Sequence, residues 1–364
     1  MKLLIVEPWL GGSHAQWAEG YRAVSVHDVS IVGLPADRWR WRLRGGAVPL
    51  AELVQRHVAT KGRPDVVLVS SPLDAARLIG LLRSELEGVP VAVYQHESQL
   101  LYPNARGVAS NDADALYDWF SWLAADVVFF NSDWHRRQVV AELPAFVRRL
   151  PDDDHVRSID RVIESFETLP LGLDLSWAAP SAERFDGTGP VVLWPHRWEP
   201  DKDPAAFARA VDRLVEVGLD ARLVLAGASG PLDDDVRRRV VDRHRRRVLA
   251  AGPFGVEEYR DWVCRSDVVV SCAHHDFFGV GVAEAVAAGC VPVVPDALNY
   301  PDLLGDAAGA FGYRPGSFGT RLADVVRDLD RWRAELPAAV AAVRCHDWGV
   351  MAAIYDQRLE ALAR

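Results

Sequence analysis

The sequence predicts an α/β fold made of two Rossmann-like domains. Short apolar runs alternate with amphipathic stretches of helical length, as in a parallel sheet covered by helices. The alternation stops at residues 171–190, which are rich in Pro, Gly and Ser, and then begins again. A chain of 364 residues is long enough for two domains. We expect a first domain, a linker, a second domain and a C-terminal helix at 1–173, 174–189, 190–348 and 349–364.

Composition restricts the class of protein. Hydrophobic residues make up 49% of the chain, but no apolar run approaches the roughly 20 residues of a membrane span. The apolar N-terminus turns Gly-rich too early for a signal peptide, and the four cysteines lack the spacing of a zinc site. The net charge of −10 argues against a general nucleic-acid binder. We expect a cytoplasmic protein without a bound metal, and the oligomeric state stays open.

The first half supplies six expected strands and five expected helices. Buried apolar runs predict strands at 3–8, 29–34, 65–71, 89–97, 126–132 and 164–170. Amphipathic stretches predict helices at 13–24, 47–60, 74–86, 112–125 and 133–143, with Ser13 as the N-cap of the first.

Polar residues stand where two of these strands end. Gly11 and Gly12 form a phosphate-type turn before Ser13 and His14, although this is weaker than a full dinucleotide fingerprint. His96 and Glu97 follow a strand at the edge where open α/β sheets bind ligands. A tight turn and a structural histidine are the alternatives.

Arginines alternate with tryptophans in one short stretch. Arginine supplies cations for phosphates, and tryptophan supplies flat faces for bases. The alternative is a solvated edge or loop. A second arginine run, between residues 237 and 247, falls on an expected helix. The arginines of the first stretch are Arg38, Arg40, Arg42 and Arg44.

The second half repeats the alternation of expected strands and helices. Strands are expected at 190–198, 221–227, 248–254, 266–273 and 290–295. Helices are expected at 204–217, 232–247, 256–265, after Phe278, at 317–335 and at 349–362.

The most informative stretch is 274–290. Asp276 lies in a loop, Phe277, Phe278 and Gly279 lead into a helix, and Glu284 falls inside it. A helix start offers unpaired N–H groups to a phosphate, and Glu284 would reach a pair of ligand hydroxyls. The stretch suits a ligand that is part sugar and part phosphate, and the alternative is an acidic surface loop.

Two cations follow the first strand of the second domain. Arg197 and Lys202 would hold a diphosphate and stabilise its charge as it leaves, without a metal. The alternative is surface ion pairing.

Asp276-x7-Glu284 with FFG resembles the E-x7-E signature of retaining GT-B glycosyltransferases of the family 4 type, in which both acids are Glu. The sequence as a whole resembles the tRNA-queuosine α-mannosyltransferase family, which commonly has Asn where Ser98 stands. The resemblance rests on GGSH (11–14), QHESQLLYP (95–103), FNSDWHR (130–136), LPLGLDL (169–175), WPHRWEPDKDP (194–204) and HDFFGVGVAEAVAAGCVPVVP (275–295).

The resemblance implies a GT-B fold, in which two Rossmann-like domains face a cleft and the C-terminal helix returns to the N-terminal domain. It implies transfer of mannose from GDP-mannose, with retention, to the cyclopentenediol of queuosine in tRNA. The nucleotide sugar is the donor, and no other cofactor or metal is implied. A small deazapurine nucleoside or another metabolite is the alternative acceptor, and a non-catalytic nucleotide-sugar binder is the alternative class.

The resemblance also implies a role for each site residue. Glu284 would bind the ribose, while His96 and Asp276 would address the donor sugar. The remaining donor-binding residues are Gly12, Arg197, Lys202, Phe277, Phe278 and Gly279. The acceptor-binding residues are Ser13, His14, Glu97, Arg38, Arg40, Arg42 and Arg44.

Overall fold

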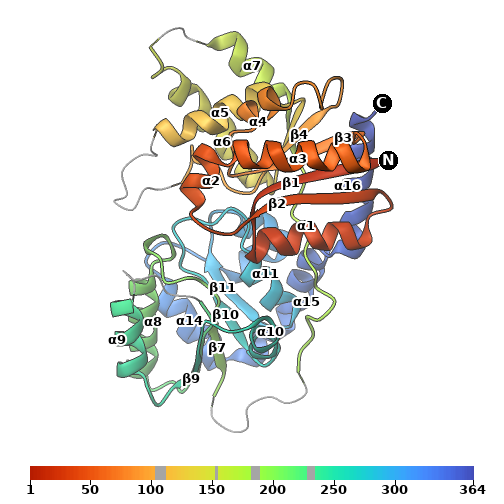
Figure 1. The fold of residues 1–364 in the computed structure, drawn as a ribbon. Coiled ribbons are helices and arrows are strands. Elements are labelled where there is room, and N and C mark those ends of the chain that lie inside the picture. Colours follow the sequence, from red (N-terminus) through yellow and green to blue (C-terminus); the bar gives the residue numbers. More distant parts are fainter. Residues whose placement is uncertain (103–111, 152–154, 182–188, 228–233) are drawn as a thin grey trace. The chain divides into compact units, whose positions relative to one another are not determined.

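The computed structural model describes residues 1–102, 112–151, 155–181, 189–227 and 234–364 (Figure 1). The chain divides into two compact units. Unit 1 comprises Met1–Asp174 and His346–Arg364, and unit 2 comprises Leu175–Cys345. The central part of the expected linker, residues 182–188, lies outside the described residues.

Unit 1 contains a parallel sheet of six strands in the order β2-β1-β3-β4-β5-β6. The strands are β1 (Lys2–Leu10), β2 (Asp28–Pro35), β3 (Val66–Ser70), β4 (Val91–Gln95), β5 (Val127–Phe130) and β6 (Phe166–Thr168). The helices are α1 (Gly12–Val24), α2 (Trp39–Gly45), α3 (Ala47–Lys61), α4 (Ala75–Leu81), α5 (Asp112–Ala124), α6 (Asp133–Val147), α7 (Val156–Glu164) and α16 (Trp348–Leu362).

Helices cover both faces of this sheet because successive strand residues point to opposite sides. Leu4 and Val6 of β1 belong to a buried apolar cluster that includes residues of α3 to α7. On the other side, α1 packs against α16, and the Tyr21 hydroxyl donates to Asp356 at 2.7 Å. The predicted return of the C-terminal helix to the N-terminal domain is therefore confirmed.

Unit 2 repeats the architecture with the strand order β12-β11-β10-β7-β8-β9. Its pairs are again parallel. The strands are β7 (Val191–Trp194), β8 (Arg222–Leu225), β9 (Val248–Ala251), β10 (Val268–Val270), β11 (Val291–Pro295) and β12 (Gly312–Tyr313). The helices are η1 (Pro200–Lys202), α8 (Pro204–Glu216), α9 (Asp234–Arg243), α10 (Val256–Cys264), α11 (Val280–Ala287), α12 (Tyr300–Leu304), η2 (Gly305–Ala307), α13 (Ala308–Phe311), α14 (Phe318–Arg327) and α15 (Leu329–Arg344).

The α/β prediction with two Rossmann-like sheets is confirmed, but two local predictions are wrong. First, α1 begins at Gly12 with Gly11 as its N-cap, so Ser13 is an exposed first-turn residue and caps nothing. Second, the single helix expected at 317–335 breaks at Asp328, where φ is −134° and ψ is 57°. The stretch of alternating Arg and Trp, for which no element was predicted, forms α2, in which Leu43 is buried and the Arg42 guanidinium donates to the Pro35 carbonyl at 3.0 Å.

None of the described helices has the length and apolarity needed to cross a membrane.

Candidate active site

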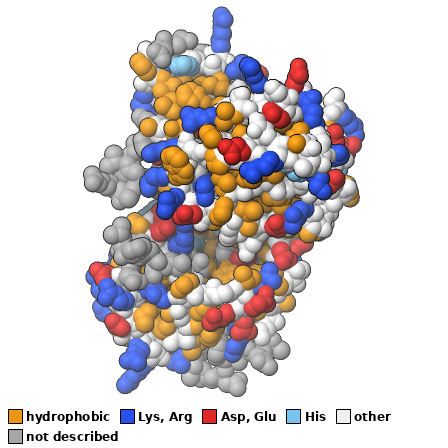
Figure 2. Space-filling model, viewed as in Figure 1, with side chains coloured by type: hydrophobic (Ala, Val, Ile, Leu, Met, Phe, Trp, Pro, Cys, Tyr) orange, Lys and Arg blue, Asp and Glu red, His pale blue; other side chains and the backbone are white. Residues whose placement is uncertain are grey.

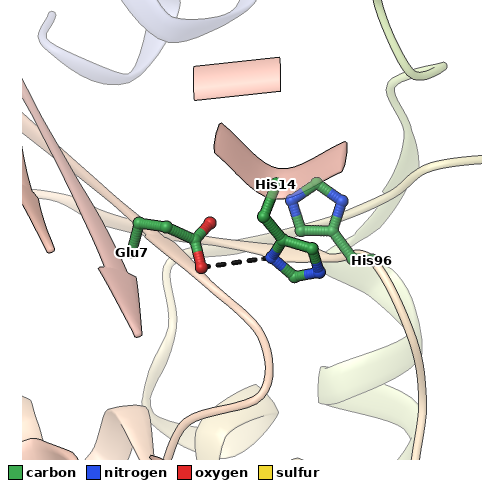
Figure 3. Close-up of side chains that lie close together, drawn as sticks. All are labelled: Glu7, His14 and His96. Carbon is green, nitrogen blue, oxygen red and sulfur yellow. Dashed lines mark hydrogen bonds and ion pairs between the residues drawn. The ribbon is translucent and has the colours of Figure 1, made fainter. Parts of the chain in front are cut away.

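In unit 1, polar side chains gather at the carboxyl ends of β1, β3 and β4, the edge where parallel sheets bind ligands. We call Glu7, His14, Ser70 and His96 the Glu7 cluster. Glu7 is the seventh residue of the chain, near the end of β1, and is fully buried. His14 lies in the first turn of α1, and its Nδ1 is 3.1 Å from Glu7 Oε1 (Figure 3). The ring of His96, which follows β4, lies 4.1 Å from that of His14.

Hydrogen bonds fix the Glu7 carboxylate. Its Oε1 also accepts the Trp9 backbone N–H at 2.8 Å, and its Oε2 accepts the Ser70 hydroxyl. A carboxylate only accepts, so the shared proton sits on Nδ1 of His14 and Nε2 is the remaining ring nitrogen.

Glu7 and His14 are electrostatically coupled. Burial alone would lower the pKa of His14, but the carboxylate of Glu7 outweighs it and Glu97 adds to the effect, so the pKa is raised above its usual value. Burial, and then the neighbouring His14 and His135, hold the pKa of His96 well below its usual value. His96 is therefore a neutral imidazole.

Glu7, His14 and His96 each offer a ligand-type atom, and these atoms lie within 4.8 Å of one another. A metal would have to displace the donors that Glu7 already accepts from Trp9, His14 and Ser70. The observed contacts therefore describe a hydrogen-bonded network, and the absence of a metal from the reaction stays a prediction.

The arginines of α2 differ in their surroundings. Arg44 donates to Asp114 through Nε at 2.8 Å and Nη2 at 2.7 Å, so it holds α2 against α5. Arg38 is exposed beside Asp37, and the Arg40 guanidinium lies 4.4 Å from the Trp39 ring centroid. Arg38 and Arg40 thus face solvent, whereas Arg42 and Arg44 support the fold.

The second arginine run also makes contacts within its own unit. Arg243 Nε lies 3.0 Å from Asp212, and Arg247 Nη1 lies 3.0 Å from Asp220. In Figure 2 basic and acidic side chains are interspersed on the visible face. The arginine count of this run therefore overstates the charge it offers to a polyanion.

In unit 2, Lys202 is held at the end of η1. Its Nζ donates to the His275 carbonyl at 2.6 Å and lies 3.2 Å from Asp201 and 3.8 Å from Asp276. Burial lowers the pKa of Lys202, but Asp276 and Asp201 outweigh it and the pKa is raised. Lys202 is therefore a fixed cation with only 12% of its side chain exposed.

Asp276 is the counter-ion of Lys202 and also accepts the Tyr300 hydroxyl at 3.0 Å. Burial would raise the pKa of Asp276, but Lys202 and then His196 outweigh it, so the pKa is lowered. Arg197 differs from Lys202, because 56% of its side chain is exposed, and it pairs with Glu199 at 3.2 Å. Of the two predicted cations, Lys202 is therefore fixed by its partners and Arg197 is accessible to solvent.

The expected helix start is present. Gly279 precedes α11 with a φ of +93°, which favours glycine, and a Cβ there would come within 2.9 Å of the Tyr300 ring. Phe277 and Phe278 are buried, and the Asn299 amide donates to the Phe278 carbonyl at 2.9 Å. These contacts hold the loop in front of the helix.

Glu284 lies in α11 and is 9% exposed. It accepts the Tyr259 hydroxyl from α10 at 2.7 Å. The carboxylate is therefore oriented by a neighbouring helix, as a residue that binds a pair of ligand hydroxyls must be.

Several supporting residues were not predicted from the sequence. Glu7 had a usable signal, since it is an acidic residue near the end of an apolar strand. Tyr259 and Tyr300 had none, because their contacts join distant segments. Gly227 had none either. A Cβ there would lie 1.6 Å from the His196 carbonyl oxygen, so only glycine leaves room for the backbone that leads to Arg197.

Comparisons with known proteins agree with the two-unit organisation. Residues 2–173 match the family model for the N-terminal region of tRNA-queuosine alpha-mannosyltransferase. Residues 189–329 match the model for glycosyl transferases group 1.

Two curated proteins extend this likeness. The tRNA-queuosine alpha-mannosyltransferase of Drosophila melanogaster is 33% identical over 312 residues, covering 83% of this chain and 81% of its own. The D-inositol 3-phosphate glycosyltransferase of Xylanimonas cellulosilytica is 30% identical over 241 residues, covering 59% of this chain and 56% of its own.

Solved structures share the fold. Sucrose-phosphate synthase from Thermosynechococcus elongatus superimposes with a TM-score of 0.70 at 15% identity, covering 100% of this chain and 99% of that one. HepE from Anabaena in complex with UDP-glucose gives a TM-score of 0.68 at 15% identity, covering 99% of this chain and 100% of that one. These neighbours confirm the predicted GT-B fold.

Proposed function

The chain belongs to the tRNA-queuosine alpha-mannosyltransferase family, and on that premise we propose that it transfers a hexose from a nucleotide sugar to queuosine in tRNA. The observation that carries the proposal is the 33% identity to the Drosophila protein, which extends over 83% of the chain. We further propose that the donor is GDP-mannose and that the reaction proceeds with retention and without a metal, in the cytoplasm.

Unit 2 contains the residues we assign to the donor. Glu284 would bind the ribose hydroxyls, with its orientation set by Tyr259. Lys202 and Arg197 would bind the diphosphate, aided by N–H groups of Phe278 and Gly279 at the start of α11. Asp276 would address the donor sugar.

The chemical step requires charge stabilisation more than a nucleophile. The bond between the anomeric carbon and the phosphate oxygen breaks, and the electron pair leaves with the nucleoside diphosphate. The acceptor oxygen bonds to the same face of the sugar, and its proton passes to the leaving phosphate. A fixed cation such as Lys202 stabilises the leaving group without reorganising during the reaction.

Unit 1 contains the residues we assign to the acceptor. Arg38, the N-cap of α2, and Arg40 within α2 face solvent, and Trp41 is 62% exposed. Cations and an aromatic face are what a single-stranded RNA loop requires. Ser13, His14 and Glu97 would contact the modified base. The roles of His96 and Gly12 toward the donor stay predictions, because both residues lie in unit 1.

A small deazapurine nucleoside is the second candidate acceptor. It is favoured by the net charge of −10 and by the internal ion pairs of the second arginine run. A non-catalytic nucleotide-sugar binder is the third candidate, and the absence of any donor turnover would favour it.

A transfer assay tests the proposal. Purified protein is incubated with queuosine-containing tRNA and either GDP-mannose or a UDP-sugar, and the digested nucleosides are analysed by mass spectrometry. We expect a hexose on queuosine only with GDP-mannose. Hydrolysis of a nucleotide sugar without transfer would contradict the tRNA acceptor while leaving the donor site in place.

A further inference from the structure

The Glu7 cluster contains a buried carboxylate to which sequence reasoning gave no role. An ionised side chain with no solvent exposure is costly unless donors compensate it. Glu7 has three such donors, and one of them is the ring of His14. The other two come from the backbone of β1 and from the end of β3, so Glu7 is fixed independently of His14.

His14 is the accessible member of the pair. Its side chain is 12% exposed, whereas that of Glu7 is 0% exposed. Figure 3 shows the second ring nitrogen of His14 on the side away from Glu7. Because the proton on Nδ1 is committed to the carboxylate, Nε2 offers a lone pair at a fixed position.

We propose that Glu7 is a positioning residue that fixes the tautomer and orientation of His14, so that Nε2 of His14 accepts a hydrogen bond from a hydroxyl of the acceptor. The acceptor of the proposed function carries a diol, and this inference rests on that function. Glu7 itself does not touch substrate. The proton of the recognised hydroxyl stays on its oxygen while the acceptor is bound.

The surroundings of His14 limit the pH range in which its imidazole can accept a hydrogen bond, because Glu7 and Glu97 raise its pKa and Nε2 carries a lone pair only above that pKa. The titratable groups that act on it are Glu7 from β1 and Glu97 and His96 from the segment after β4. His96 is neutral, and its ring lies tilted by 39° against that of His14, so it contributes no second charge. Protonation of His14 at low pH would remove the Nε2 lone pair and weaken acceptor binding.

The test compares wild type with Glu7→Gln. Gln has the shape of Glu without the charge, so the pKa of His14 should fall. We expect the KM for the acceptor to rise about tenfold, as for loss of one hydrogen bond of ordinary strength, while the KM for the donor stays within about twofold. In the pH profile of kcat/KM for the acceptor, the acidic limb, where activity falls as His14 is protonated, should move to lower pH. A merely structural role of Glu7 would not cause this shift.

The matched control is Asp212→Asn. Asp212 pairs with His244 at 2.9 Å in unit 2, so the same carboxylate-to-amide change is made beside a histidine outside the Glu7 cluster. We expect this variant to keep the wild-type acceptor KM and acidic limb. An equal effect of both variants would overturn the assignment.

His14→Gln provides a second variant in case Glu7→Gln fails to fold. We expect its acceptor KM to rise and its acidic limb to disappear. An unchanged limb would overturn the proposal, as would loss of activity on chelation with recovery on adding a divalent cation, since the Glu7 cluster would then bind a metal.

Nitrogen NMR of the histidine side chains separates this inference from the proposed function. We expect Nδ1 of His14 to carry the proton in wild type, with a pKa that falls in Glu7→Gln. If wild type transfers no hexose to queuosine but the NMR result holds, the proposed function fails and the Glu7–His14 interaction stands. If transfer occurs but His14 is protonated on Nε2, the inference fails and the function stands.

Discussion

Replacing Lys202 with methionine removes a cation that lies between two carboxylates. Removing one partner of a buried ion pair costs about 3–5 kcal/mol. Because 12% of the Lys202 side chain is exposed, we expect the lower end, about 3 kcal/mol. For a domain the size of unit 2, each kcal/mol lowers Tm by about 2–4 °C, so its transition should fall by about 6–12 °C.

The same change should reduce turnover. Loss of one preorganised group that stabilises the leaving charge lowers kcat by about 10²–10³-fold. The assay is hexose transfer at a temperature where circular dichroism shows the variant to be folded. The double variant Lys202→Met, Asp276→Asn removes one of the uncompensated carboxylates, so it should recover part of the stability and none of the rate.

Arg209→Met is the matched control for this prediction. Arg209 lies 3.9 Å from Asp203 on the same unit, but 70% of its side chain is exposed. An exposed pair of this kind contributes about 0–1 kcal/mol, so both Tm and kcat should stay close to wild type. A folded Lys202→Met protein that turns over within threefold of wild type would refute the role given to Lys202.

Three further predictions concern nucleotide binding, RNA binding and pH. Glu284→Gln should raise the Kd for GDP about tenfold by calorimetry, because an amide accepts at only one oxygen; an unchanged Kd would remove Glu284 from the ribose site. Arg40→Ser should make the slope of the logarithm of the tRNA association constant against log salt less negative by about one. An unchanged slope would exclude a contact between Arg40 and a phosphate. Burial lowers the pKa of His196 and His275 to about 4. The unfolded chain therefore binds more protons between about pH 4 and 6.5, and unit 2 should gain about 3 kcal/mol per histidine as pH rises through that window. A free energy of unfolding of unit 2 that does not change across this pH range, measured by urea unfolding, would contradict this prediction.

The fold was readable from the sequence because its signals are local. Continuous apolar strands alternate with amphipathic helices, and the two sheets agree with that prediction. The return of α16 to unit 1 was implied by the resemblance to GT-B glycosyltransferases and not by these local signals. Element ends were less predictable. The break at Asp328 interrupts an amphipathic pattern that continues through it, and the helical face of α2 was hidden by its unusual charge.

The site was only partly readable. Asp276, Gly279 and Glu284 fall in one short segment, so their spacing carries information by itself. The groups that orient them lie outside this segment, since Tyr300 and Tyr259 reach Asp276 and Glu284 from separate helices. The arginines of α2 show the same limit, because only the structure reveals that Arg44 is paired with Asp114.

The most direct measurement compares two preparations of one tRNA that differ only in queuosine at the wobble position. Each is incubated with the protein and radiolabelled GDP-mannose, and label retained in the tRNA is counted. We predict incorporation into the queuosine-containing preparation alone, with a kcat/KM well above that for free queuosine nucleoside. Equal kcat/KM for the nucleoside, or equal labelling of both tRNA preparations, would contradict the assignment of queuosine in tRNA as the acceptor.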